Sequence, residues 1–306
     1  MTAQQRDLVH QILRDAPFDL GGDVAVHRAL MEQMLTAQPL PDDVRMTPGE
    51  LGGVPVIFID IVDVEPRGTI FHMHGGGFAL GSARGSVGLA STLARKTGLR
   101  AVSIDYRLAP EAPFPAAVDD VTAAYGALTD QLGDSSRIIV SGESAGGNLA
   151  VELLIASRAS GVALPAAALL LSPMTDLTVA GESFSTKTRV DPNITATAIR
   201  TRVAEYLSDT DPSDPRVSPI FADLSGLPPL LIQAGSHEVL LDDATRLAVK
   251  AAGDDVAVTL DITPEVPHVF QAFAGILDEG NAALDRAAAF IGHHLDAAGA
   301  LRNTSH

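Results

Sequence analysis

From about residue 54 onward, short apolar runs alternate with longer segments whose apolar residues recur about every 3.6 positions. The short runs are rich in β-branched residues, and several are continuously apolar, as strands buried in a parallel sheet are. Strands are predicted at 54–62, 69–74, 101–106, 137–141, 167–172, 229–235 and 256–263. Helices are predicted at 86–97, 116–131, 145–160, 242–252 and 282–298. This alternation predicts an α/β fold with a mostly parallel central sheet flanked by helices.

Two segments fall outside this alternation. Residues 1–45 are predicted to be mainly helical, with one apolar stripe formed by Leu30, Met31, Met34 and Leu35. Residues 176–214 are much longer than an ordinary connection and carry a predicted helix at 195–207. Long insertions in compact folds often act as lids or binding elements. Since no repeat or low-complexity linker divides the chain, we expect one core at 46–306 with two helical additions.

Composition excludes several kinds of partner. The 306 residues carry 21 Lys and Arg against 38 Asp and Glu, and this formal charge of −17 repels nucleic acid and anionic membranes. The absence of cysteine excludes disulfides and thiolate metal sites, and it fits a reducing cytoplasm. The N-terminal residues lack the apolar core of a secretory signal, and the apolar run at 163–173 is too short to span a bilayer. We expect a soluble, cytoplasmic protein that binds neither nucleic acid nor membrane.

A candidate nucleophile lies between a predicted strand and a predicted helix. Residues 142–146 read Gly-Glu-Ser-Ala-Gly, the G-x-S-x-G pattern of a nucleophile elbow. The elbow holds its serine in a strained turn, so the residues two before and two after must be nearly free of side chain, and Gly142 and Gly146 meet that need. The alternative is that Ser144 merely caps a helix. Because a strand precedes it and a helix follows it, we favour Ser144 as a catalytic nucleophile.

A glycine-rich loop follows the strand predicted at 69–74. Its sequence, His74-Gly75-Gly76-Gly77-Phe78, matches the HGGG-type loop that supplies an oxyanion-stabilising N–H in esterases. The predicted oxyanion donors are Gly76, Gly77 and Ala145. A phosphate loop is disfavoured because neither GxxxxGK[ST] nor GxGxxG follows. His72 and His74 form an H-x-H pair, but hydrogen bonds to the loop are a better interpretation than metal binding, and we expect neither metal nor cofactor.

The base is chosen by its place along the chain. In α/β-hydrolases the order is serine, acid, histidine, so only histidines after Ser144 qualify. His268 lies in a loop directly after the strand predicted at 256–263. The other histidines precede that strand, lie in the C-terminal helix or end the chain: His237, His293, His294 and His306. The sequence therefore predicts His268 as the general base.

Four carboxylates compete for the role of the acid. Asp242 and Asp243 fall at the start of a predicted helix, where acids stabilise the N-terminus without any chemistry. Glu238 lies in the turn after the strand predicted at 229–235, from which it can reach the base. We favour Glu238, while Asp176 and Asp242 remain alternatives.

Taken together, these motifs resemble the bacterial hormone-sensitive lipase family of esterases. The similar blocks occur in the family's order and cover the chain from about 70 to 273: 72–78, 105–111, 114–117, 142–147, 238–240 and 267–270. The resemblance implies an α/β-hydrolase fold whose helical cap is made from 1–45 and 176–214. It also implies that Gly76, Gly77 and Ala145 are oxyanion donors. The chain departs from the family where Glu143, Glu238 and Val269 stand, and the sequence does not decide what Glu143 does.

The expected activity is ester hydrolysis by a Ser144–His268–Glu238 triad, and the resemblance implies a preference for short-chain acyl esters. Met31, Met34 and Phe78 are candidate substrate contacts. The alternatives are an amide, formamide or lactone hydrolase with the same triad, or a ligand-binding homologue without catalysis. The apolar alternation in the strand at 256–263 is typical of an exposed sheet edge, so we expect a homodimer.

Overall fold

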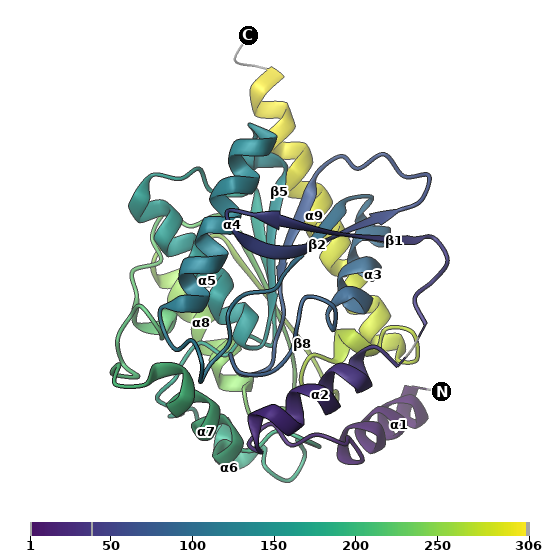
Figure 1. Ribbon diagram of the computed structural model, residues 1–306, viewed down its shortest axis with the longest axis vertical. Coiled ribbons are helices and arrows are strands. Elements are labelled where there is room, and N and C mark those ends of the chain that lie inside the picture. Colours follow the sequence, from purple (N-terminus) through teal and green to yellow (C-terminus); the bar gives the residue numbers. More distant parts are fainter. Residues whose placement is uncertain (1, 38, 304–306) are drawn as a thin grey trace.

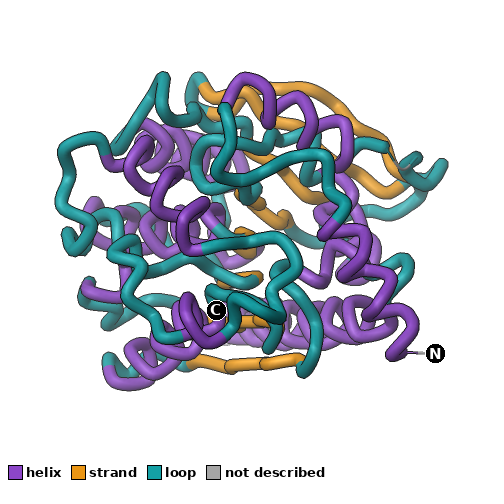
Figure 2. The backbone as a smooth tube through the Cα atoms, turned by 90° about the horizontal axis from the view of Figure 1, so that it is seen from below, coloured by secondary structure: helices purple, strands orange, loops and turns teal. Residues whose placement is uncertain are grey.

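The structure, a computed structural model, describes residues 2–37 and 39–303. Its centre is an eight-stranded sheet in the order β1-β2-β4-β3-β5-β6-β7-β8 (Figures 1 and 2). The strands from β4 to β8 in that order run parallel, whereas β2 pairs antiparallel with both β1 and β4. The strands are β1 (Val44–Leu51), β2 (Val54–Ile61), β3 (Thr69–Met73), β4 (Arg100–Ile104), β5 (Ile138–Glu143), β6 (Ala167–Leu171), β7 (Leu230–Gly235) and β8 (Val258–Thr263).

Helices cover both faces of the sheet, as the sequence predicts. One face packs against α4 (Ala116–Leu132), α5 (Ala145–Ser160) and α8 (Leu241–Gly253), and the other against α3 (Val87–Thr97) and α9 (Asp278–Asn303) (Figure 1). The central strands β3 and β6 are buried along their whole length. Continuously apolar runs can form strands here because water reaches neither face of the sheet.

The first strand, β1, was not predicted from the sequence. It pairs only with β2 at one edge of the sheet, and most of its side chains are partly or fully exposed. It contains Pro48 and Gly49, both poor strand formers, so its sequence does not show the pattern that predicts a strand. Consequently the boundary predicted at residue 45 lies inside β1.

The two segments outside the alternation come together over one end of the sheet (Figure 1). We call them the helical layer, residues 2–35 and 176–214. Its helices are α1 (Thr2–Arg14), α2 (Val24–Leu35), α6 (Ser183–Thr186) and α7 (Ala196–Leu207).

Two arginines attach this helical layer. Arg28 of α2 donates hydrogen bonds to the carbonyls of Ala79 and Ala109, both at 2.6 Å. Arg202 of α7 is fully buried and donates to the carbonyl of Gly22 at 2.9 Å, which joins parts of the layer 180 residues apart in sequence. The layer is therefore tied both to the sheet domain and within itself.

Candidate active site

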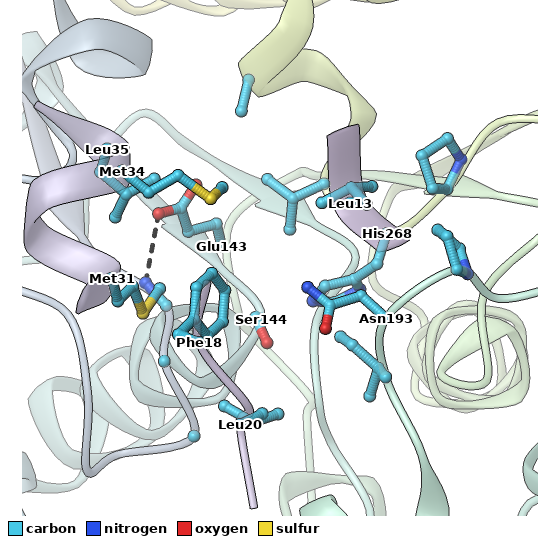
Figure 3. A pocket seen from close by; sticks show the side chains of 18 of the residues that line it. Leu13, Phe18, Leu20, Met31, Met34, Leu35, Glu143, Ser144, Asn193 and His268 are labelled. Carbon is cyan, nitrogen blue, oxygen red and sulfur yellow. Dashed lines mark hydrogen bonds between the residues drawn. The ribbon is translucent and has the colours of Figure 1, made fainter. Parts of the chain in front are cut away.

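A cavity of about 140 Å³ lies between the strand ends and the helical layer (Figure 3). Its floor is formed by residues that follow β3, β5 and β8: Gly75, Gly76, Gly77, Glu143, Ser144, Pro267, His268 and Val269. Its walls are mostly apolar side chains of the helical layer, among them Leu13, Phe18, Leu20, Met31, Met34, Leu35 and Ile194. The polar groups that can do chemistry thus meet at the bottom of an apolar pocket.

Ser144 occupies the sharp turn from β5 into α5. Its backbone φ is 54°, in the left-handed region that a residue with a side chain rarely adopts. A Cβ on Gly142 would lie 2.0 Å from the carbonyl oxygen of Gly146, and a Cβ on Gly146 would lie 2.1 Å from that of Met73. The two glycines are therefore required by close backbone contacts, as the sequence predicts.

The glycine loop after β3 presents free backbone donors beside this turn. Gly76 and Gly77 have positive φ values of 116° and 62°, and a Cβ on Gly76 would lie 2.3 Å from the carbonyl oxygen of Leu80. In the part of the chain that the structure describes, the N–H groups of Gly76, Gly77 and Ala145 donate to no acceptor. Ala145 begins α5, where the first N–H groups of a helix have no partner within the helix. These N–H groups are available to a ligand.

Glu143 connects the serine turn to the glycine loop, a role that the sequence left open. Its partly buried carboxylate accepts hydrogen bonds from the N–H of Gly75 at 3.2 Å, drawn as the dashed line in Figure 3, and from the Ser86 hydroxyl at 3.0 Å. Burial raises the pKa of Glu143, and these two hydrogen bonds oppose that rise. The side chain thus holds the glycine loop against the turn that carries Ser144.

His268 is paired with Glu238. Its Nδ1 lies 2.7 Å from the Glu238 carboxylate, which is fully buried at the end of β7 and also accepts from the N–H of Gly235 at 3.2 Å. Burial alone would lower the pKa of His268, but the hydrogen bond and the negative charge of Glu238 outweigh it and the pKa is raised. With Nδ1 held by Glu238, Nε2 is the ring nitrogen left to act in the pocket.

The other candidate acids have different partners. Asp176 bonds the Arg246 guanidinium at 2.6 Å, and Asp242 accepts from the N–H of Ser183 at 2.9 Å. Asp243 accepts from the N–H of Thr175 at 2.7 Å, and burial raises its pKa to about 7. None of these three carboxylates bonds His268, so the geometry favours Glu238.

The histidine pair beside the loop is structural. The Nδ1 of His72 lies 3.2 Å from the Ser141 hydroxyl, and the Nδ1 of His74 lies 2.8 Å from the carbonyl of Gly75. Burial lowers the pKa of His72 to about 3 and that of His74 to about 4, so both rings are neutral at neutral pH. His74 also stacks on Tyr106, with ring centroids 4.2 Å apart. The interpretation that these rings hold the loop in place agrees with these contacts.

Among the described histidines, His268 alone lines the cavity. His237 packs edge-on against His10, whereas His293 and His294 pack together on α9. His306 lies outside the described residues.

Of the three predicted substrate contacts, Met31 and Met34 line the cavity and Phe78 does not. Phe78 is fully buried and stacks on Tyr206 of α7, with ring centroids 3.8 Å apart. Its φ of 63° turns the chain directly after the glycine loop, so the ring enters the core beneath the floor. This prediction from the sequence was wrong. Phe18 lines the cavity instead, but it lies in a loop between α1 and α2, where no periodicity marks an inward-facing residue.

Comparison with known proteins agrees with this fold. Residues 70–272 match the family described as alpha/beta hydrolase fold. An esterase from Acinetobacter venetianus is 37% identical over 264 residues, covering 86% of this chain and 87% of the relative. An acetyl-hydrolase from Streptomyces hygroscopicus is 42% identical over 223 residues, covering 73% and 75%. The crystal structure of an esterase from the bacterial hormone-sensitive lipase family superposes with a TM-score of 0.92 at 40% identity, covering 95% of this chain and 98% of that one.

The chain therefore belongs to the α/β-hydrolase family. Within it, the protein is an esterase of the hormone-sensitive lipase family, a serine hydrolase of carboxylic esters. As for membranes, none of the helices in the described parts of the chain has the length and apolar character needed to span one.

Proposed function

We propose that the protein hydrolyses short-chain acyl esters through a triad of Ser144, His268 and Glu238. The observation that carries the proposal is the 2.7 Å pair between His268 and a fully buried Glu238, at a pocket whose floor includes Ser144 in a left-handed turn. A carboxylate that fixes the imidazole tautomer and a serine on a strained elbow are the two parts that acyl transfer requires.

The reaction proceeds in two halves. His268 Nε2 takes the proton from the Ser144 hydroxyl as Oγ attacks the ester carbonyl carbon. The N–H groups of Gly76, Gly77 and Ala145 stabilise the oxyanion, and the tetrahedral intermediate collapses as His268 returns the proton to the leaving alcohol. A water molecule, deprotonated by His268, then attacks the acyl-enzyme and releases the carboxylic acid and free Ser144. Glu238 stabilises the imidazolium in both halves.

The preference for short acyl chains rests on the size and lining of the pocket. A volume of about 140 Å³ is below the roughly 300–1,000 Å³ of sites for drug-sized ligands. The walls are formed by Leu13, Phe18, Met31 and Ile194, which exclude water from an acyl group without offering it polar partners. The name of the Streptomyces hygroscopicus relative, acetyl-hydrolase, is consistent with a small acyl group. In this proposal the segments 1–45 and 176–214 act as a cap over the catalytic domain at 46–306.

The decisive experiment replaces the nucleophile. Ser144→Ala is expected to lower kcat for p-nitrophenyl acetate by about 10⁵-fold or more, because no other group can form the acyl-enzyme. Ser160→Ala, at the exposed far end of the same helix, is the matched control and is expected to keep wild-type activity. A fluorophosphonate probe should label the wild-type chain at residue 144. Activity of Ser144→Ala near the wild-type value would refute the assignment.

We also propose that two chains associate through β8 and that the protein is cytoplasmic. Among the described strands β8 pairs only with β7, and its Leu260 side chain is 39% exposed, so its free edge can pair with a second copy. Light scattering is expected to give about twice the 31.8 kDa of one chain, and a mass of one chain at micromolar concentration would contradict the dimer. The cytoplasmic location is supported by the absence of cysteine.

A further inference from the structure

A second cavity, of about 440 Å³, lies outside the active-site pocket. It is bounded by α1, by residues 189–190 of the helical layer and by Glu265 in the turn after β8. Where the active-site pocket has mostly apolar walls, this one is lined mainly by charged and imidazole groups: Arg6, Asp7, His10, Arg14, Arg189, His237 and Glu265. Its chemistry therefore differs from that of the esterase site.

The cavity gathers positive charge in a strongly acidic chain. Three guanidinium groups line it, although the whole sequence carries a formal charge of −17. Arg6 is neutralised, because it bonds Glu265 at 3.0 Å and Glu279 at 3.2 Å. Arg14 and Arg189, by contrast, form no ion pair with any described residue. Two arginines and one carboxylate, Asp7, thus line this cavity without an ion pair among the described residues, so its unpaired groups carry a net positive charge.

Two imidazoles of this cavity carry unused nitrogen atoms. His10 is only 9% exposed and packs edge-on against His237, with ring centroids 5.5 Å apart. The Nε2 of His10 and the Nδ1 of His237 are buried, and neither has a hydrogen-bond partner among the described residues. A buried polar atom without a partner costs about 1–3 kcal/mol, so a ligand that supplies the partner is favoured.

We propose that this cavity binds a small oxyanion, the carboxylate or phosphate group of a metabolite. Guanidinium groups bind carboxylate and phosphate oxygens through paired N–H donors, and protonated imidazoles add further donors. A cation is disfavoured by the three arginines, and the described residues contain no group of three His, Asp or Glu side chains suited to a metal. The anion enters between α1 and the 189–190 segment and is held by Arg14, Arg189 and His10.

The site lies next to the active-site pocket along the chain. Leu13 lines the active-site pocket, and the next residue, Arg14, lines the second cavity. Likewise Asp191 lines the active-site pocket, and the residue before it, Val190, lines the second cavity. His237 directly precedes Glu238. An anion that bridges Arg14 and Arg189 therefore ties α1 to the other segment of the helical layer at the edge of the substrate pocket, and stabilises the folded state by mass action.

Binding is expected to be coupled to proton uptake. Burial is the largest cause that lowers the pKa of both His10 and His237, and an anion beside the rings opposes it. Affinity should therefore rise as pH falls from 8 to 6. The other charges that act on the two rings are Arg6, Asp7, Arg14, Lys187, Asp191 and Glu265.

Titration calorimetry at low ionic strength tests the proposal directly. The full chain is titrated with sodium phosphate, with sodium butyrate and, for the pH comparison, with sodium sulfate, whose charge does not change between pH 6 and 8. Saturable binding of phosphate or butyrate beyond the effect of sodium chloride at equal ionic strength is expected. Tighter phosphate binding would identify a phosphate site, and tighter butyrate binding a carboxylate site. Absence of saturable binding by both anions would overturn the proposal.

A double variant locates the site. Arg14→Gln with Arg189→Gln is expected to weaken binding at least tenfold and to abolish the anion-dependent rise in Tm. Both side chains are exposed, so the variant is expected to fold, which circular dichroism verifies. Arg200→Gln, an exposed arginine on α7 without an ion pair among the described residues, is the matched control and should bind as the wild type does. Equal binding by the double variant and the wild type would overturn the proposal, whether or not the esterase assignment holds.

Discussion

The floor and the walls of the active-site pocket are built in different ways. The floor consists of residues at strand ends, held by backbone contacts so close that Gly142 and Gly146 have no room for a methyl group. The walls consist mostly of apolar side chains from α1, α2, the loop between them and residues 192–194, where Asn193 is the polar exception. The wall side chains border a cavity. A larger or smaller side chain there changes the space available to the substrate and does not collide with the backbone.

This difference separates chemistry from selectivity. In the proposed mechanism, groups in the floor act on the reacting atoms at fixed distances, so a substitution there is expected to change the rate by orders of magnitude. Groups in the wall contact the substrate through dispersion and burial, where one methylene is worth about 1–3 kcal/mol. We therefore expect large changes in kcat from the floor and modest changes in chain-length preference from the wall.

The largest effect tests Glu238, the proposed acid, which lies behind the floor and bonds His268. Glu238→Gln is expected to lower kcat by about 10³–10⁴-fold, because the neutral amide neither fixes the tautomer of His268 nor stabilises its imidazolium. Asp176→Asn is the matched control: its carboxylate bonds Arg246 and not His268, so kcat should stay within about threefold while stability falls by about 1–2 kcal/mol. Steady-state kinetics and thermal unfolding of both variants measure this. A greater loss of kcat in Asp176→Asn would make Asp176 the acid.

The next largest effect is on the pH dependence of kcat/KM, because Glu238 raises the pKa of His268. The base must be neutral, and its pKa is raised above the usual 6.5, so kcat/KM is expected to fall about tenfold per unit as pH drops below that raised pKa. In Glu238→Gln the raising charge is lost, and the acid limb of the residual activity should move to lower pH. A pH-stat assay with ethyl acetate follows both profiles. An acid limb at the same pH in the two proteins would show that Glu238 does not act on His268.

The smallest effect concerns the wall. Phe18→Ala enlarges the cavity, and the ratio of kcat/KM for p-nitrophenyl hexanoate to that for the acetate is expected to rise about fivefold. Phe221→Ala, at a ring 44% exposed that does not line this cavity, should leave the ratio unchanged. Competition between the two esters in one reaction measures the ratio. A drop in the ratio would mean that Phe18 supports long chains instead of excluding them.

The same difference explains what the sequence could predict. Ser144 and the glycine loop form local patterns in the sequence, because Gly142, Gly146 and Gly76 are required by close backbone contacts. His268 was selected by its order along the chain. The choice of Glu238 needed only its place after a strand. The wall residues Leu13 and Phe18 come from separate segments whose meeting depends on tertiary packing, and no spacing in the sequence records it.

Two errors have the same origin. Phe78 follows the glycine loop so closely that a place in the pocket was expected, but its positive φ directs the ring onto Tyr206. The edge strand β1 was missed because its pairing partner, and not its own residues, specifies it. The role of Glu143 likewise required knowing that the N–H of Gly75 and the hydroxyl of Ser86 lie beside it.

The contact between Gly146 and the end of β3 has a consequence for anyone who wishes to redesign this catalyst. Because the backbone of Gly146 packs directly against the carbonyls of Met73 and His74, a side chain at this position would push the turn that carries Ser144 away from the glycine loop. Random mutagenesis of Gly142 and Gly146 is expected to give mostly misfolded proteins. Varying the side chains at positions 13, 18, 31, 34 and 194 is expected to leave the reaction intact and to change which acyl groups are accepted.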